Sequence, residues 1–339
     1  MNAARPPSSP IAISVGDPAG IGPELIAEAW TRRESAALAP FFVVGGAEAL
    51  RAAAAARGLN VPILEIDNAD AASASFDKHL PILVGEDAEY RPGSPDRQGA
   101  ELALTSLRLA TELAIEGAAS AVVTAPIAKA ELAKIGFEHP GQTEFLAAVC
   151  GLDSNDAVMM LAGPSLRTVP LTVHCALADV PSMLSREMIC HRARITASAL
   201  TRDFGIENPR LAIAGLNPHA GEHGRFGQEE AQVIEPAIAE LRAEGLDVTG
   251  PHPADAMFTP RARDRYDAAL CMYHDQALIP LKALEFDEGV NVTLGLPIIR
   301  TSPDHGTAFD IAGKGVADPG ALIAAIKLAG ECAARRANG

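Results

Sequence analysis

The fold of this chain is indicated first by the stretch Ile11-Ala12-Ile13-Ser14-Val15-Gly16-Asp17-Pro18-Ala19-Gly20-Ile21-Gly22-Pro23-Glu24. Its first five residues form an apolar run that predicts a buried strand, and the glycine-rich turn after it precedes a helix. The turn is neither G-x-G-x-x-G nor a P-loop, because it lacks both spacings. It can bring backbone N–H groups close to a ligand, or it is a tight turn that needs glycine for steric reasons.

Outward from this stretch, apolar runs alternate with segments of helical periodicity. Strands are expected at 41–44, 120–124, 169–173, 210–214, 268–272 and 290–294. Helices are expected around 51–57 and at 98–116, 185–203 and 229–244. This alternation is typical of an α/β fold with substantial parallel sheet.

The length of 339 residues suggests two domains. The chain is 48% hydrophobic but only 4% aromatic, so aliphatic side chains must fill the core. No Ser/Gly or Pro stretch is long enough to be a linker. The chain therefore crosses between its domains through ordinary elements, and we expect both termini to belong to one domain.

A formal net charge of −15 disfavours nucleic acid and anionic membrane surfaces as partners, since both attract a positive field. No run approaches the ~20 apolar residues of a membrane helix, and the polar segment Met1–Pro10 has no signal-peptide core. The five cysteines form no C-x-x-C pair, which favours reduced thiols. We expect a cytoplasmic protein.

Three of the nine histidines follow predicted strands. His174 follows the run 169–173, His219 follows 211–216 after a short turn, and His274 follows 268–273. Ligands of open α/β sheets bind outside the carboxyl ends of the strands.

A single histidine at a strand end is usually a structural or surface residue, whereas three at equivalent ends can converge on one divalent ion. Three protein ligands and an open position are typical of catalytic zinc sites. Asp275 directly follows His274 and can orient an imidazole or add a ligand.

Positive and amide side chains supply a candidate anion site. Lys282, Asn291 and Arg300 lie within one segment after His274 and together suit a phosphate or carboxylate. Taken singly, each is an ordinary surface residue. A second glycine-rich stretch, 304–315, is polar enough to bind a ligand, which the residues themselves do not identify.

Together these motifs resemble a known family. Gly16-Asp17 with Gly20 to Glu24, and Asp304 to Gly315, resemble the isocitrate and isopropylmalate dehydrogenase superfamily. Within it, the segments 216–222, 250–255, 272–276 and 289–297 are similar to the 4-hydroxythreonine-4-phosphate dehydrogenase family. The resemblance runs from about Ile11 to about Ala329.

The resemblance implies two α/β domains with an active-site cleft between them. We expect a cofactor-side domain of residues 1–140 plus 300–339, and a metal, substrate and dimerisation domain of residues 141–299. It also implies a homodimer whose active site lies at the subunit interface. The implied reaction is the NAD- or NADP-dependent oxidation and decarboxylation of 4-phosphooxy-L-threonine to 3-amino-2-oxopropyl phosphate.

The resemblance also assigns residues to roles. One divalent metal, zinc, cobalt or magnesium, is bound by His174, His219 and His274. Substrate binding is assigned to Gln142, Thr143, Lys282, Asn291 and Arg300. Cofactor binding is assigned to Gly16, Asp17, Gly20, His305, Gly306, Thr307 and Asp310. Lys129 and Asp255 are candidates for the general base.

One position departs from the family pattern, because Gln142 stands where the family has histidine. An amide can bond a phosphate but cannot carry a proton. The substrate is therefore open to alternatives: threonate or erythronate phosphate, or an aromatic cis-dihydrodiol. A phosphate acyltransferase would need neither the histidine trio nor the cofactor loop, and a non-catalytic metal-binding protein would not reduce NAD.

Overall fold

The computed structural model describes residues 9–338, which divide into two compact units. Unit 1 comprises Met1–Ser154 and Leu296–Gly339, and unit 2 comprises Asn155–Gly295. Residues 141–154, expected in the second domain, lie in unit 1, where Phe145 packs on the cluster of Ala100, Leu132 and Phe137. Residues 1–8 of the segment Met1–Pro10, in which no signal-peptide core is expected, lie outside the described residues.

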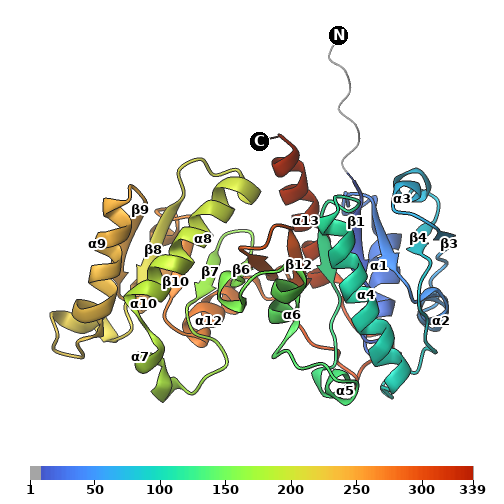
Figure 1. Ribbon diagram of the computed structural model, residues 1–339, viewed down its shortest axis with the longest axis horizontal. Helices are drawn as coiled ribbons and strands as arrows, with labels where there is room; N and C mark the ends of the chain where they lie inside the picture. Colours follow the sequence, from blue (N-terminus) through green and yellow to red (C-terminus); the bar gives the residue numbers. More distant parts are fainter. Residues whose placement is uncertain (1–8, 339) are drawn as a thin grey trace, which may run out of the picture. The chain divides into compact units, whose positions relative to one another are not determined.

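Unit 1 is built on six parallel strands (Figure 1). Along the sheet their order is β3-β4-β2-β1-β5-β12. They are β1 (Ile11–Ser14), β2 (Phe41–Val44), β3 (Ile63–Ile66), β4 (Leu80–Leu83), β5 (Val122–Thr124) and β12 (Arg300–Pro303). The central strand β1 pairs with β2 and β5, and its residues are fully buried. Its carboxyl end, and the glycine turn after it, therefore lie in the middle of the sheet.

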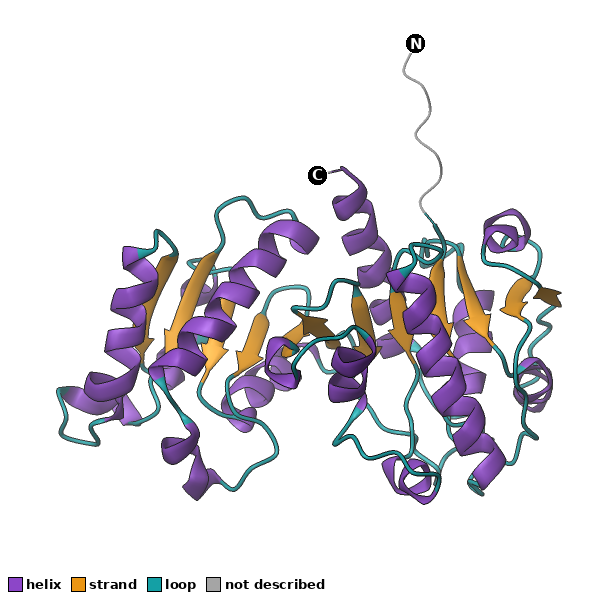
Figure 2. Ribbon diagram, in the orientation of Figure 1, coloured by secondary structure: helices purple, strands orange, loops and turns teal. Residues whose placement is uncertain are grey.

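Helices cover this sheet (Figure 2). They are α1 (Gly22–Thr31), α2 (Ala47–Ala56), α3 (Asp70–Ser75), α4 (Arg97–Ile115), α5 (Lys129–Lys134), α6 (Gln142–Val149) and α13 (Gly320–Asn338). Helix α4 contacts β1, while α13 contacts β12. Helix α4 begins where Asp96 caps it, since the Asp96 Oδ1 accepts a hydrogen bond from the Gly99 N–H at 2.8 Å.

Unit 2 contains a mixed set of strands. Their order is β11-β6-β7-β10-β8-β9. They are β6 (Val158–Ala162), β7 (Arg167–Pro170), β8 (Arg210–Ala214), β9 (Asp247–His252), β10 (Ala268–Cys271) and β11 (Val290–Leu294). β10 pairs in parallel with β7 and β8, whereas β6 pairs antiparallel with β7 and β11. The parallel part carries the strands that precede the three histidines.

Helices and short turns of unit 2 connect these strands. The helices are α7 (Val180–Met183), α8 (Arg186–Phe204), α9 (Glu235–Ala243), α10 (Ala254–Met257), α11 (Pro260–Arg263) and α12 (His274–Glu285). Shorter turns are η2 (Leu177–Asp179), η3 (Pro218–Glu222) and the π-helical η4 (Glu230–Ile234), and η1 (Ser154–Asp156) lies where the chain leaves unit 1. The described residues include no helix that is both long and apolar enough to span a membrane.

The α/β fold class expected from the sequence is confirmed, and several element boundaries need correction. The strand expected at 169–173 is β7 and ends at Pro170, because Leu171 and the residues after it leave the ladder to form a loop. The helix expected at 229–244 begins as the π-helical turn η4 before α9 continues it. Apolar periodicity marks a buried face but does not reveal such local changes of hydrogen bonding.

A cavity in the buried centre of unit 1 should strongly lower the free energy of unfolding. Ile13 in β1 is 0% exposed, whereas Ile115 at the end of α4 is 46% exposed. We expect Ile13→Ala to lower the free energy of unfolding by about 2–5 kcal/mol, because the site cannot fully collapse. The matched control Ile115→Ala should change it by no more than about 0.5 kcal/mol. Urea titration followed by circular dichroism checks this, and equal midpoints for the two variants would contradict the assigned core.

Candidate functional site

The parallel pairing of β10 with β7 brings two of the three strand-end histidines together. Leu270 lies opposite Val169 in the ladder, so the two chains leave the sheet side by side. The imidazole of His174 lies beside that of His274, with ring centroids 5.8 Å apart. Two imidazoles at this separation can bind one cation between them.

Two hydrogen bonds hold these loops to each other beyond the strands. The Leu171 N–H donates to the Cys271 carbonyl at 2.7 Å, and the buried Thr172 hydroxyl donates to the Met272 carbonyl at 2.8 Å. His174 itself has a φ of 47°, in the left-handed region that an L-residue rarely adopts. The backbone therefore turns sharply at His174 and leaves its side chain exposed.

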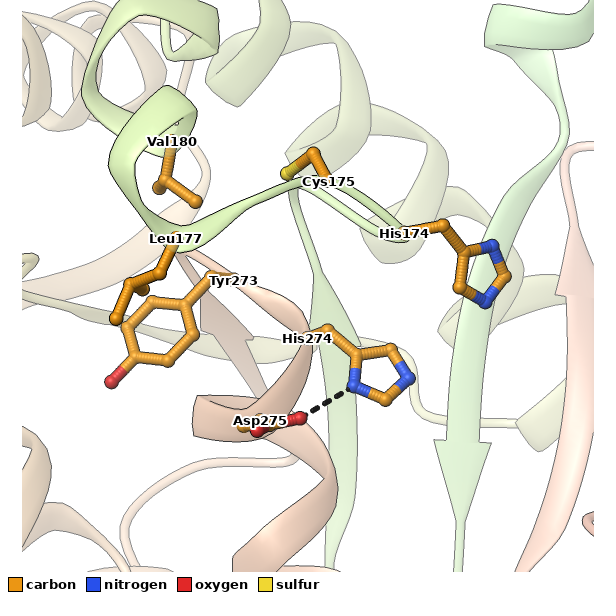
Figure 3. A pocket seen from close by; sticks show the side chains of 7 residues that line it. All are labelled: His174, Cys175, Leu177, Val180, Tyr273, His274 and Asp275. Carbon is orange, nitrogen blue, oxygen red and sulfur yellow. Dashed lines mark hydrogen bonds and ion pairs between the residues drawn. The ribbon is translucent and has the colours of Figure 1, made fainter.

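A cavity of about 280 Å³ opens at this point (Figure 3). This cavity is called the histidine pocket. It is lined by His174, Cys175, Leu177, Val180, Tyr273, His274 and Asp275. The pocket combines apolar walls with two imidazoles and a carboxylate. This composition suits a small polar ligand that is held by a few directed contacts.

The carboxylate of Asp275 fixes the orientation of one imidazole. The Asp275 Oδ1 lies 2.7 Å from the His274 Nδ1, and Figure 3 shows this bond on the side of His274 away from His174. A proton on Nδ1 donated to the carboxylate leaves Nε2 as the electron-pair donor. A carboxylate in this position is the usual partner of a metal-binding histidine.

His219 lies on a different loop of unit 2. It belongs to η3, its ring centroid is 6.1 Å from that of Phe226, and it is not among the residues that line the histidine pocket. Within residues 9–338, no group of three His, Cys, Asp or Glu side chains is close enough to bind a metal. The structure therefore brings together two members of the expected trio, and the shared centre stays a prediction.

The two glycine-rich segments expected to bind a cofactor lie together in unit 1. The Ile21 N–H donates to the Thr307 carbonyl at 3.0 Å. A Cβ at Gly20 would lie 2.8 Å from that same carbonyl oxygen, so only glycine allows this approach. The turn after β1 and the loop after β12 are thus in contact, and residues 16–22 of the turn are buried.

Asp17 places a buried carboxylate in this turn. It is 1% exposed and its Oδ1 accepts a hydrogen bond from the Ala19 N–H at 2.9 Å. Burial raises its pKa from 3.8 to about 6, and the nearby carboxylates of Glu131 and Asp96 act in the same direction. Of the other expected cofactor residues, Gly16 has a φ of 73° in the same turn, and the His305 ring bonds the Gly306 carbonyl. Asp310 is exposed.

Arg300 forms a second polar centre in unit 1. It is 4% exposed, and its Nη2 donates to the Thr124 hydroxyl at 2.8 Å and to the Gln142 Oε1 at 2.7 Å. The Gln142 Nε2 in turn donates to the Ala125 carbonyl at 3.1 Å. Burial lowers the pKa of Arg300 to about 10, which still leaves it charged at neutral pH. The nearby carboxylate of Glu144 acts on this pKa in the opposite direction. A desolvated guanidinium oriented by a hydroxyl and an amide suits an anion.

The remaining expected residues lie around these centres. In unit 1, Thr143 follows Gln142 in the first turn of α6. A Cβ at Gly141 would lie 3.3 Å from the Lys129 Nζ and 3.1 Å from the Glu144 Oε2, so both side chains reach this turn. In unit 2, Lys282 lies in α12 together with His274, and Asn291 lies in β11.

Asp255, the other candidate base, lies in the short helix α10 and is exposed. The sequence did not indicate that Thr124 bonds Arg300 or that Gln276 bonds the Gly215 carbonyl. Thr124 is the last residue of an apolar strand and Gln276 lies shortly after another, and these positions were the only signal.

The fold and the two polar centres fit an α/β enzyme, and comparison with known proteins shows that it is an oxidoreductase. The family model described as "Pyridoxal phosphate biosynthetic protein PdxA" matches residues 37–329. The chain is 66% identical, over 98% of its length and 99% of the relative's, to a protein of Erythrobacter litoralis named 4-hydroxythreonine-4-phosphate dehydrogenase. The chain belongs to the PdxA family.

Solved structures agree with this assignment. A crystal structure of 4-hydroxythreonine-4-phosphate dehydrogenase from Klebsiella pneumoniae matches with a TM-score of 0.85 and 39% identity, covering 98% of this chain and 99% of that one. A terephthalate 1,2-cis-dihydrodiol dehydrogenase from Burkholderia xenovorans matches less well, with a TM-score of 0.66 and 29% identity over 95% and 97% of the two chains.

The raised pKa of Asp17 predicts a specific pH dependence of stability. Because the pKa in the folded chain lies above the ordinary value of 3.8, the ionised carboxylate destabilises the fold progressively as pH rises from about 4 to about 6. Asp17→Asn should therefore gain stability relative to the unchanged protein over this interval, by about 1–3 kcal/mol at pH 7. Urea midpoints at pH 4.5 and 7.5 measure this difference.

The exposed Asp67 supplies the control for this experiment. Asp67→Asn removes the same charge without a burial cost, so its stability difference should be nearly the same at both pH values. A constant difference for Asp17→Asn would show that the Asp17 carboxyl titrates normally.

Proposed function

We propose that this chain acts as a 4-hydroxythreonine-4-phosphate dehydrogenase. It oxidises 4-phosphooxy-L-threonine with NAD or NADP and decarboxylates the product to 3-amino-2-oxopropyl phosphate, in pyridoxine 5'-phosphate biosynthesis. The observation that carries this proposal is the 66% identity over 98% of the chain with a protein of that name. The five free cysteines favour a cytoplasmic location.

The phosphate and carboxylate groups of the substrate need a positively charged side chain, and Arg300 of unit 1 supplies one. Arg300 is buried and oriented by Thr124 and Gln142, so its guanidinium loses little freedom when it binds phosphate or carboxylate. Thr143, in the first turn of α6, adds a hydroxyl and a helix N-terminus. Lys282 and Asn291 of unit 2 are proposed as further contacts.

The residues of unit 2 fit a divalent cation. The paired rings of His174 and His274 and the Asp275 carboxylate on the His274 Nδ1 are the donor set and the supporting partner that such an ion uses. We assign His219 as the third ligand, with zinc, cobalt or magnesium as the ion. When bound, the cation polarises the hydroxyl to be oxidised and stabilises negative charge on the same oxygen as carbon dioxide leaves.

The chain's own groups then have separate tasks. Asp275 keeps the His274 Nε2 in its electron-donating form. The turn at Gly16, Asp17 and Gly20 and the loop at Thr307 that contacts it are assigned to the nicotinamide cofactor, together with His305, Gly306 and Asp310. Lys129, which reaches the turn at Gly141, and the exposed Asp255 are the proposed candidates for the general base.

We also propose that the chain forms a homodimer with its active site at the subunit interface. Large apolar side chains of unit 2 are exposed in the single chain: Leu177 at 66%, Met183 at 42%, Phe226 at 45%, Ile279 at 64%, Leu284 at 48% and Phe286 at 71%. Ile279, Leu284 and Phe286 come from α12 and the residue after it, the helix that begins with His274. A second copy would remove this apolar surface from water.

One alternative substrate class has support. The match to a terephthalate 1,2-cis-dihydrodiol dehydrogenase at 29% identity keeps an aromatic cis-dihydrodiol as the second candidate, together with threonate or erythronate phosphate. Gln142, which replaces a histidine of the family pattern, is the residue that makes this comparison necessary.

The proposed reaction is tested by a substrate panel. Purified protein with zinc, cobalt or magnesium should reduce NAD or NADP with 4-phosphooxy-L-threonine at a far higher kcat/KM than with the other candidates. His219→Ala should abolish this turnover while the protein stays folded, because one ligand of the cation is lost. Absorbance of NADH at the nicotinamide band records both results. Full turnover by metal-stripped His219→Ala protein would end the metal mechanism, and a faster dihydrodiol would replace the substrate.

The proposed dimer is tested by charge on the exposed apolar surface. Ile279→Glu combined with Phe286→Glu should convert the dimer to a monomer, because two charges would be buried without partners. Ile115→Glu, at a comparably exposed position of unit 1, is the control and should leave the dimer intact. Sedimentation velocity measures the mass, and an unchanged dimer in the double variant would place the interface elsewhere.

A further inference from the structure

The loop that carries His219 has an unusual backbone. Six consecutive residues have positive φ: His219 at 54°, Ala220 at 51°, Gly221 at 76°, Glu222 at 42°, His223 at 57° and Gly224 at 84°. Four of these six are not glycine, and each of those four is strained in this region. Such a run persists only where the surrounding structure holds it.

A buried carboxylate holds the entry to this loop. Glu230 is 3% exposed and is the first residue of the π-helical turn η4. Its Oε1 accepts a hydrogen bond from the Asn217 backbone N–H at 2.7 Å, and its Oε2 accepts one from the Asn217 Nδ2 at 3.0 Å. Asn217 lies two residues before His219, so both bonds fix the chain directly before the strained run.

Two glycines make room for this carboxylate. A Cβ at Gly221 would lie 2.6 Å from the Glu230 Oε2, and a Cβ at Gly215 would lie 3.3 Å from the Glu230 Oε1. Gly215 follows β8, and Gly221 lies inside the strained run. The carboxylate is therefore enclosed by the loop on both sides of His219.

A second buried side chain, Gln276, ties the same segment to the loop of His274. Gln276 is 8% exposed, its Nε2 donates to the Gly215 carbonyl at 2.8 Å, and its Oε1 accepts from the Met272 N–H at 2.7 Å. Because Gln276 lies in the first turn of α12, it ties the end of β8 to the loop that precedes His274. Gln276 and Glu230 thus hold the segment after β8 at two points, Gly215 and Asn217, and Gln276 links it to the loop that carries His274.

We propose that Glu230 is a positioning residue that holds the 217–223 loop in its left-handed form and so presents His219 for metal binding. The second half of this statement rests on the proposed function, in which His219 is a metal ligand. Glu230 has no contact with the metal or the substrate in this assignment. Its role is to accept the hydrogen bonds from the Asn217 backbone N–H and from the Asn217 Nδ2.

The test uses Glu230→Gln in the full-length protein, which keeps the size of the side chain. The glutamine oxygen can accept from one Asn217 donor, but its NH₂ group then faces the other donor. The matched control is Glu235→Gln, which removes the same charge from an exposed position at the start of α9. Circular dichroism and NAD binding establish that each variant is folded.

Two readouts address the two halves of the proposal. First, trypsin cleavage after the exposed Arg225, at the end of this loop, should be faster in metal-free Glu230→Gln than in Glu235→Gln. Second, zinc affinity, measured by competition with a chromophoric chelator, should fall about 10- to 100-fold in Glu230→Gln only. The visible absorption of bound cobalt should change as well, since it reports the ligand geometry.

Asn217→Asp is the second variant, in case Glu230→Gln is unstable. It places a third carboxylate against those of Glu229 and Glu230 without altering η4, and it should reproduce both effects. Unchanged cleavage after Arg225 in both variants would overturn the role of Glu230 in the loop. Faster cleavage with unchanged zinc affinity would overturn its link to metal binding, provided that His219→Ala loses zinc. If His219→Ala retains zinc, the metal assignment in the proposed function fails instead, and the cleavage result still decides the role of Glu230.

Discussion

The parallel pairing of β10 with β7 and β8 is the constraint on which the rest of unit 2 depends. Leu270 lies opposite Val169 and Ile213, so the three strands run together and their continuations leave the sheet at one edge. Hydrogen bonds from Leu171 and Thr172 to the continuation of β10 keep two of these segments together beyond the ladder. Two histidines more than 90 positions apart in the sequence consequently meet.

In unit 1, neighbouring parallel strands likewise bring distant segments of the sequence together. β1 is central in its sheet, and the glycine turn after it meets the loop that follows β12, through the Ile21 N–H and the Thr307 carbonyl. Two segments near opposite ends of the sequence thus meet in unit 1. The approach requires glycine at position 20, because a Cβ there would lie 2.8 Å from the Thr307 carbonyl oxygen.

Buried polar side chains connect the scaffold to the chemistry in both units. Arg300, Gln276 and Glu230 are nearly inaccessible, and each bonds to a group at or just beyond the end of a strand. Burial of these groups is unfavourable unless their hydrogen bonds are made, so each can occupy only one arrangement. Their hydrogen bonds therefore fix their positions. The strained backbone of the loop after Asn217 is likewise held in one conformation by its surroundings.

From the sequence alone, the α/β alternation, most of the central strands of each unit and the two glycine-rich segments could be predicted, but not that these two segments meet. These follow from local apolar periodicity and from motifs that lie in single segments. The sequence also indicated three histidines at strand ends. The tertiary structure alone decided which of them meet, because strand order is a long-range property. It also revealed that Gln142 bonds Arg300 and Glu230 bonds Asn217, contacts that depend on side chains brought together only when the sheets form.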